Sequence, residues 1–154
     1  VRSPPTRLAT MPAPAVATAD FPTMQDRPDA FVMIYDGHCK FCRANIRWIS
    51  AIDQGRIAYV SLHDPIVRER WPELSYEQLM EHLYLVDGED KYPGAAAFRF
   101  LSRNLVALFP IAPLMHIPGS LRVWQYMYDC VARIRYRFGR IEDCENGTCS
   151  VHFD

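Results

Sequence analysis

The chain has 154 residues, of which 49% are hydrophobic and 23% are charged, and its formal net charge is −1. This composition is typical of one globular domain, and the charge provides no overall attraction to nucleic acid or to an anionic membrane. Its closest approach to a membrane span, residues 105–115, is interrupted by Pro110 and Pro113 and falls short of the roughly 18 apolar residues that a transmembrane helix needs. We therefore expect no nucleic-acid partner and no membrane span.

Prolines recur among alanines and threonines through the first 29 residues, with no helical or strand periodicity. Such a segment buries too little apolar surface to offset the entropy of ordering it. We expect residues 1–29 to be a disordered leader, residues 30–140 to form the folded domain, and residues 141–154 to form a cysteine-containing tail. The prolines also interrupt the apolar core that a secretory signal would need, which favours a cytoplasmic protein.

The predicted elements begin with a short, apolar, β-rich strand at residues 31–35, which Asp36 and Gly37 end. Apolar residues then recur at helical spacing until a glycine ends the helix: Ile46, Ile49, Ile52 and Gly55. A second strand follows at residues 56–62. Strand, helix and strand within about thirty residues predict a β-α-β unit.

Two short helices and a hairpin are predicted next. The helix starts are indicated by a capping residue with a following proline and by a serine with a glutamine three residues later: Asp64, Pro65, Ser75 and Gln78. Residues 82–86 and 90–92 are expected to pair as antiparallel strands around an Asp87-Gly88 turn.

The last part of the domain is predicted to be helical. A helix from Ala95 to about Leu105 precedes a connection bent by prolines, and Ser120 is expected to cap a long helix that Gly139 ends. Cys130 falls on the apolar stripe of this helix, which favours interior packing. Four arginines near its end are expected to complement the helix dipole: Arg133, Arg135, Arg137 and Arg140.

This order of elements, β-α-β-(α)-β-β-α, matches a thioredoxin-like α/β fold. We expect three α/β/α layers, with a four-stranded mixed sheet between helices and a long C-terminal helix.

The Cys39-x-x-Cys42 pair lies at the start of the first predicted helix. Unpaired N–H groups and the helix dipole favour a thiolate there, and the thiolate is the form that attacks disulfides. Helical spacing places Cys42 on the buried face and Cys39 one turn earlier, exposed. We therefore expect Cys39 to attack a disulfide and Cys42 to resolve the mixed disulfide, with no bound cofactor.

Four neighbouring residues are expected to support the pair: Asp36, Gly37, His38 and Lys40. Charged Lys40 and His38 would lower the pKa of Cys39, and Asp36 would raise it. The other histidines within the predicted domain are assigned to surface or capping positions, and His82 is the one expected to approach the cysteines. The three tryptophans are predicted to be core or groove residues.

Two other functions stay open at this stage. A zinc module would bind the metal through Cys39, Cys42, Cys144 and Cys149, or through three of these cysteines and His152. Cys144 and Cys149 are alternatively a disulfide, a second redox pair or idle residues. A redox-inactive interaction domain would use its cysteines only for packing.

Three segments resemble the DCC family of thiol-disulfide oxidoreductases: Tyr35-Asp36-Gly37-His38-Cys39-Lys40-Phe41-Cys42, Tyr92-Pro93-Gly94-Ala95-Ala96-Ala97 and Arg135-Tyr136-Arg137-Phe138-Gly139-Arg140. The first resembles the family's YDGxCxxC signature, and together they span about residues 31–140. The resemblance implies a thioredoxin-like fold and protein-disulfide reductase activity, with Cys39 and Cys42 as the redox cysteines. We expect a monomer that acts on a protein or small-molecule disulfide, with an electron donor that the residues do not identify.

Overall fold

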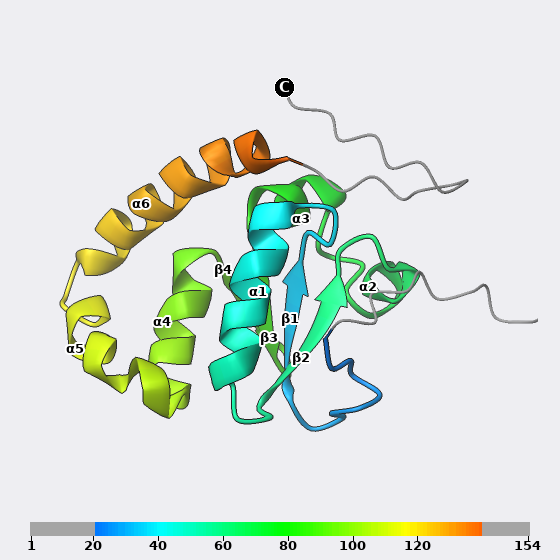
Figure 1. Cartoon of the computed structure of the whole chain (residues 1–154), viewed down its shortest axis with the longest axis horizontal. Coiled ribbons are helices and arrows are strands. Elements are labelled where there is room, and N and C mark those ends of the chain that lie inside the picture. The colour runs from blue at the N-terminus through cyan, green and yellow to red at the C-terminus, as the bar shows by residue number, and fades with distance from the viewer. Residues whose placement is uncertain (1–20, 140–154) are drawn as a thin grey trace, which may run out of the picture.

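The structure is a computed structural model that describes residues 21–139 (Figure 1). Four strands form one sheet in the order β2-β1-β3-β4: β1 (Phe31–Tyr35), β2 (Ile57–Ser61), β3 (Tyr84–Asp87) and β4 (Asp90–Pro93). β1 pairs with β2 in parallel, whereas β3 pairs antiparallel with both β1 and β4. The predicted four-stranded mixed sheet is confirmed.

Helices cover both faces of this sheet because side chains alternate along each strand. On one face, Met33 and Tyr35 of β1 join a core with α1 (Lys40–Ile52) and α4 (Ala95–Asn104). On the other face, Ile34 joins a core with α2 (Pro65–Arg70) and α3 (Tyr76–Glu81). The expected thioredoxin-like three-layer arrangement is therefore confirmed.

The folded part of the chain begins before the boundary expected at residue 29. Phe21 is buried, and its ring lies 5.9 Å from that of Tyr35 and 5.7 Å from that of Tyr59, between ring centroids. Arg27 Nη1 lies 2.7 Å from Oδ2 of the buried Asp53. Residues 21–29 thus pack on the domain, while residues 1–20 and the tail from residue 140 lie outside the described residues.

The helix starts follow local capping chemistry, with one correction. The Asp64 side chain accepts a hydrogen bond from the Ile66 N–H, and Ser75 and Gln78 form the expected capping box. Ser120, the expected cap of the long helix, is instead its first residue, and its Oγ donates to the Met115 carbonyl at 3.1 Å. Gly119 takes the preceding position with φ +82°, a left-handed conformation that a glycine adopts readily.

The expected bent connection and long C-terminal helix are present, and each contains a 3₁₀ segment that was not expected. A 3₁₀ helix, η1 (Val106–Ile111), leads into a short α5 (Ala112–Met115), and α6 (Ser120–Ile134) passes into a second 3₁₀ helix, η2 (Arg135–Phe138). Figure 1 shows α6 arching past α4 and returning to the region of α1 and α3. None of the fifteen residues of α6 is buried.

A narrow contact holds α6 against the domain. Leu83 donates its backbone N–H to the Tyr128 hydroxyl at 2.8 Å, and the Tyr128 ring lies 6.3 Å from the Phe98 ring. Most of the helix surface remains outside this contact. Cys130, which was expected to pack in the interior, is exposed for this reason.

No single helix in the described part of the chain is long and apolar enough to cross a membrane. Residues 95–104 and 106–115 reach that length and composition only together, and the two segments are bent by 115° at their junction.

Gly94, the N-cap of α4, lies directly against α6. It has φ +50°, and a Cβ atom there would lie 3.1 Å from the Tyr128 ring. Gly88 also has a positive φ, +61°, but a Cβ atom at residue 88 would meet no other group within 4 Å. The two glycines therefore share backbone strain and differ in packing.

We expect Gly94→Ala to lower the free energy of unfolding by about 1–3 kcal/mol, because backbone strain and a contact with Tyr128 add together. Gly88→Ala is the control, since it introduces the backbone strain alone. Urea unfolding measures both variants. Equal losses would show that the contact with Tyr128 does not limit residue 94.

Candidate active site

Cys39 is the N-cap residue of α1, directly after the turn that follows β1. Its backbone is extended, with φ −89° and ψ 116°, and its Sγ accepts the Cys42 N–H at 3.2 Å. The sulfur thus lies where the first N–H groups of a helix lack partners within the helix. Cys39 and Cys42 are both free thiols, and they occupy the helix start that the sequence predicts.

The expected exposure of Cys39 is wrong. Cys39 is 0% exposed and Cys42 is half-buried. The 3₁₀ helix η2 packs against the first turn of α1: Lys40 N–H donates to the Gly139 carbonyl at 3.3 Å, and Phe138 stacks on Phe41 with ring centroids 5.4 Å apart. Helical periodicity within α1 contains no information about this segment, which lies almost a hundred residues later.

The pKa values of the two thiols are shifted in opposite directions. The hydrogen bond from the Cys42 thiol lowers the pKa of Cys39 to about 7, and the Cys42 N–H acts in the same direction, while burial opposes both. The same thiol hydrogen bond raises the pKa of Cys42, and burial and the charge of Cys39 raise it further. Cys39 is therefore the thiolate of the pair, and Cys42 is the thiol that donates to it.

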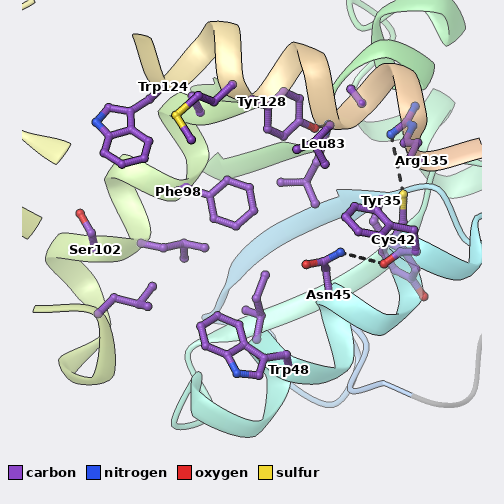
Figure 2. A pocket seen from close by; sticks show the side chains of 18 of the residues that line it. Tyr35, Cys42, Asn45, Trp48, Leu83, Phe98, Ser102, Trp124, Tyr128 and Arg135 are labelled. Carbon is purple, nitrogen blue, oxygen red and sulfur yellow. Dashed lines mark hydrogen bonds between the residues drawn. The ribbon is translucent and has the colours of Figure 1, made fainter. Parts of the chain in front are cut away.

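Arg135 supplies the positive charge of the site. It lies where α6 passes into η2, is 5% exposed, and points its Nη1 at the Cys42 Sγ at 3.7 Å (Figure 2). Its Nη2 donates to the Met80 carbonyl. Arg135 lowers the pKa of both cysteines. The sequence grouped it with the arginines at the helix end, so its role in the site was missed.

A carboxylate and two histidines lie on the other side of the turn. Asp36 is 2% exposed; its Oδ1 accepts the His38 N–H at 3.0 Å and lies 3.1 Å from His63 Nε2. The His38 and His63 rings stack with centroids 3.9 Å apart. Asp36 raises the pKa of both cysteines, as expected for a nearby negative charge.

His63 was assigned to the surface, although the sequence contained a signal for its position. Tyr35 and Ser61 are partners at the ends of the parallel strands β1 and β2. Residues that closely follow two such ends meet at one edge of the sheet; Asp36 is the first residue after β1, and His63 is the second after β2. His82, expected near the cysteines, lies against α6, with its ring 5.7 Å from the Tyr128 ring.

The other two supporting residues, Gly37 and Lys40, lie in the turn and at the helix start. Gly37 is buried in the turn between Asp36 and Cys39, and Lys40 begins α1. Neither the Lys40 ammonium nor the His38 ring is among the causes of the lowered pKa of Cys39. Lys40 and His38 were expected to lower the pKa of Cys39. The hydrogen bonds from Cys42 and the charge of Arg135 lower it instead.

An apolar groove of about 380 Å³ begins at Cys42 and runs between α1, α4 and α6. Trp48 of α1, Phe98 of α4 and Trp124 of α6 line the part away from the cysteine, and Tyr128 lies between Trp124 and Arg135 on the α6 side (Figure 2). Trp71, by contrast, belongs to the core on the other face of the sheet. The half-buried sulfur of Cys42 therefore opens onto a large apolar surface.

The described residues contain no group of three or more histidines, cysteines or acidic residues placed to hold a metal ion. Cys144, Cys149 and His152, which the zinc interpretation requires, lie outside the described residues.

We expect the thiolate absorbance of Cys39 to rise with pH around pH 7 and to level off above it, because its pKa is lowered to about 7. Cys42→Ala removes the thiol donor and should move this transition to higher pH. Cys42→Ser, which keeps a hydroxyl donor, should move it less. An ultraviolet titration measures the transition after the absorbance of the Cys39→Ser protein is subtracted. Identical transitions in Cys42→Ala and Cys42→Ser would exclude the thiol hydrogen bond as the cause of the lowered pKa.

Arg135→Gln should raise the pKa of Cys39, because the substitution removes the nearby positive charge. Arg133→Gln is the matched control, since Arg133 is exposed on the same helix. The same titration, with alkylation rates at pH 7, compares the two variants. If both shift the pKa equally, the overall charge of the helix end is responsible and the position of Arg135 is not.

The comparison with known proteins agrees with this geometry. A family model described as DCC1-like thiol-disulfide oxidoreductase matches residues 33–141, which include both cysteines, Asp36, His63 and Arg135. No curated protein and no solved structure matches the chain. The family match covers most of the chain and contains the thiol pair at a helix N-terminus, so the chain belongs to the DCC1-like thiol-disulfide oxidoreductase family.

Proposed function

We propose that this protein reduces or exchanges disulfides through Cys39 and Cys42. The observation that carries the proposal is the Cys39 sulfur at the N-cap of α1, where it accepts the Cys42 N–H at 3.2 Å and has a pKa lowered to about 7. About half of such a thiol is ionised at neutral pH, and a thiol with a pKa near the ambient pH is close to the optimum for attack. A cysteine used only for packing would gain nothing from this arrangement.

In the proposed reaction, the Cys39 thiolate attacks one sulfur of the substrate disulfide, and the other sulfur leaves as a thiolate that takes up a proton. Cys42 then loses its proton and attacks Cys39 Sγ, which releases the second substrate thiol. The products are a Cys39–Cys42 disulfide and a reduced substrate with two thiols. Because Cys39 has no exposed surface, the packing around the first turn of α1 has to open before the substrate sulfur reaches it.

The second step needs a proton acceptor, because the pKa of Cys42 is raised. We assign this role to Asp36, whose charge already acts on both cysteines. His63 lies against Asp36 at 3.1 Å and can pass the proton onward to solvent, since its side chain is partly exposed. Arg135 stabilises the thiolate that each step produces. We propose further that the protein acts as a cytoplasmic monomer that is returned to the dithiol by an external thiol donor.

Cys42→Ser should accumulate mixed disulfides with substrate through Cys39, because the attacking thiolate remains and the resolving thiol is absent. Cys39→Ser should accumulate none. Non-reducing electrophoresis after acid quenching, with mass spectrometry of the linked peptide, identifies the cysteine involved.

Cys130→Ser is the control, because Cys130 is exposed on α6 and lies outside the Cys39-x-x-Cys42 motif, so this substitution should leave trapping unchanged. Trapping by Cys39→Ser alone would exchange the two assigned roles. If neither variant traps substrate and the wild type does not reduce a model disulfide, the proposed function is wrong.

A further inference from the structure

We propose that the apolar groove beside Cys42 binds a polypeptide segment of the substrate, one that carries large apolar side chains next to its disulfide-bonded cysteine. This inference rests on the proposed function and names the substrate class of the same site. It follows from three features of the groove: its opening, the distribution of its charges, and an unpartnered acceptor at its cysteine end.

The groove is open to solvent along its length. Several residues that line it are also strongly exposed: Trp48 57%, Ile111 44%, Met127 51% and Val131 41%. Its volume of about 380 Å³ lies within the range of pockets that bind ligands. An exposed apolar surface of this extent on a single domain usually marks a binding site. An open groove accommodates side chains of a chain that lies along it, without enclosing the whole ligand.

Charge within the groove is confined to one end. Of the 22 described residues that line it, Asp36 and Arg135 are the only charged ones, and both lie at the cysteines. The remainder of the lining is apolar or uncharged, so an ionised side chain placed there would lose hydration without a partner. The groove therefore favours apolar side chains beyond the substrate sulfur.

Asp36 distinguishes a polypeptide from a small apolar disulfide. Asp36 Oδ2 is buried and has no hydrogen-bond partner within the described part of the chain. A buried acceptor of this kind costs free energy until a donor reaches it. Once the packing around the first turn of α1 has opened, a peptide supplies such a donor, the backbone N–H beside its cysteine, whereas an apolar organic disulfide has none. We therefore assign the groove to a polypeptide.

The test compares two cystine peptides that differ only beside the cysteine. Each is the disulfide-linked dimer of a blocked tetrapeptide, with cysteine followed by leucine, phenylalanine and lysine in one case, and by serine, asparagine and lysine in the other. In a single turnover that starts from the Cys39–Cys42 dithiol, we expect the wild type to reduce the apolar dimer with a second-order rate constant roughly tenfold or more above that of the polar dimer, as an apolar pocket discriminates. The ratio of the two values is the readout.

Two substitutions in the groove should bring this ratio toward one. Trp124→Ala removes part of the wall, and Ala132→Phe places a ring in the space; Trp124 and Ala132 both line the groove and neither is buried. Val123→Ala is the matched control, because Val123 is 60% exposed on the same helix and does not line the groove. It should keep the wild-type ratio.

The outcomes separate this inference from the function on which it rests. If the wild type reduces both peptides at equal rates, the substrate class is wrong and the disulfide reductase activity stands. If it reduces neither, the proposed function fails, and the inference fails with it. If bis(2-phenylethyl) disulfide is reduced as fast as the apolar peptide, with the same dependence on Trp124, the occupant is a small molecule and the assignment to a polypeptide is overturned.

Discussion

The site is organised around the hydrogen bond from the Cys42 N–H to the Cys39 sulfur. It gives the first turn of α1 its cap and holds a polarisable anion at the positive end of the helix. A second hydrogen bond, from the Cys42 thiol, fixes which cysteine carries the charge, because it lowers the pKa of Cys39 and raises that of Cys42 in return. Helix capping and thiol reactivity thus depend on the same neighbour, Cys42, through its N–H and its thiol.

Two buried side chains of opposite charge, Asp36 and Arg135, act on the cysteine pair. Asp36 follows β1 and raises the pKa of both cysteines, whereas Arg135 comes from the far end of the chain and lowers them. Isolated charges of this kind are costly in an interior, so each depends on its partners: His63 for Asp36, and the Met80 carbonyl for Arg135. The hydrogen bonds from the Cys42 thiol and N–H, more than these two charges, keep the pKa of Cys39 near neutrality although the residue has no exposed surface.

The C-terminal helix α6 links reactivity to the proposed recognition of substrate. One face of its C-terminal end brings Arg135 to Cys42, and the preceding turns provide Trp124 and Tyr128 to the groove. The helix buries none of its own residues and is held by few contacts, among them the Tyr128 hydroxyl with Leu83. A wall built in this way can adapt to different apolar side chains while the thiol pair stays on the rigid sheet and α1.

The sequence by itself determined the sheet, the helices that cover it and the place of the thiol pair, because these follow from local periods, caps and turns. Three examples depend only on residues a few positions apart: the apolar stripe of Ile46 and Ile49, the capping box at Ser75, and the apolar strand before Asp36. It did not determine the exposure of Cys39, the approach of Arg135 to Cys42 or the groove, since all three depend on where α6 and η2 pack. That packing brings together residues almost a hundred positions apart in the sequence. A local sequence pattern contains no information about such contacts, so only the tertiary structure decided them.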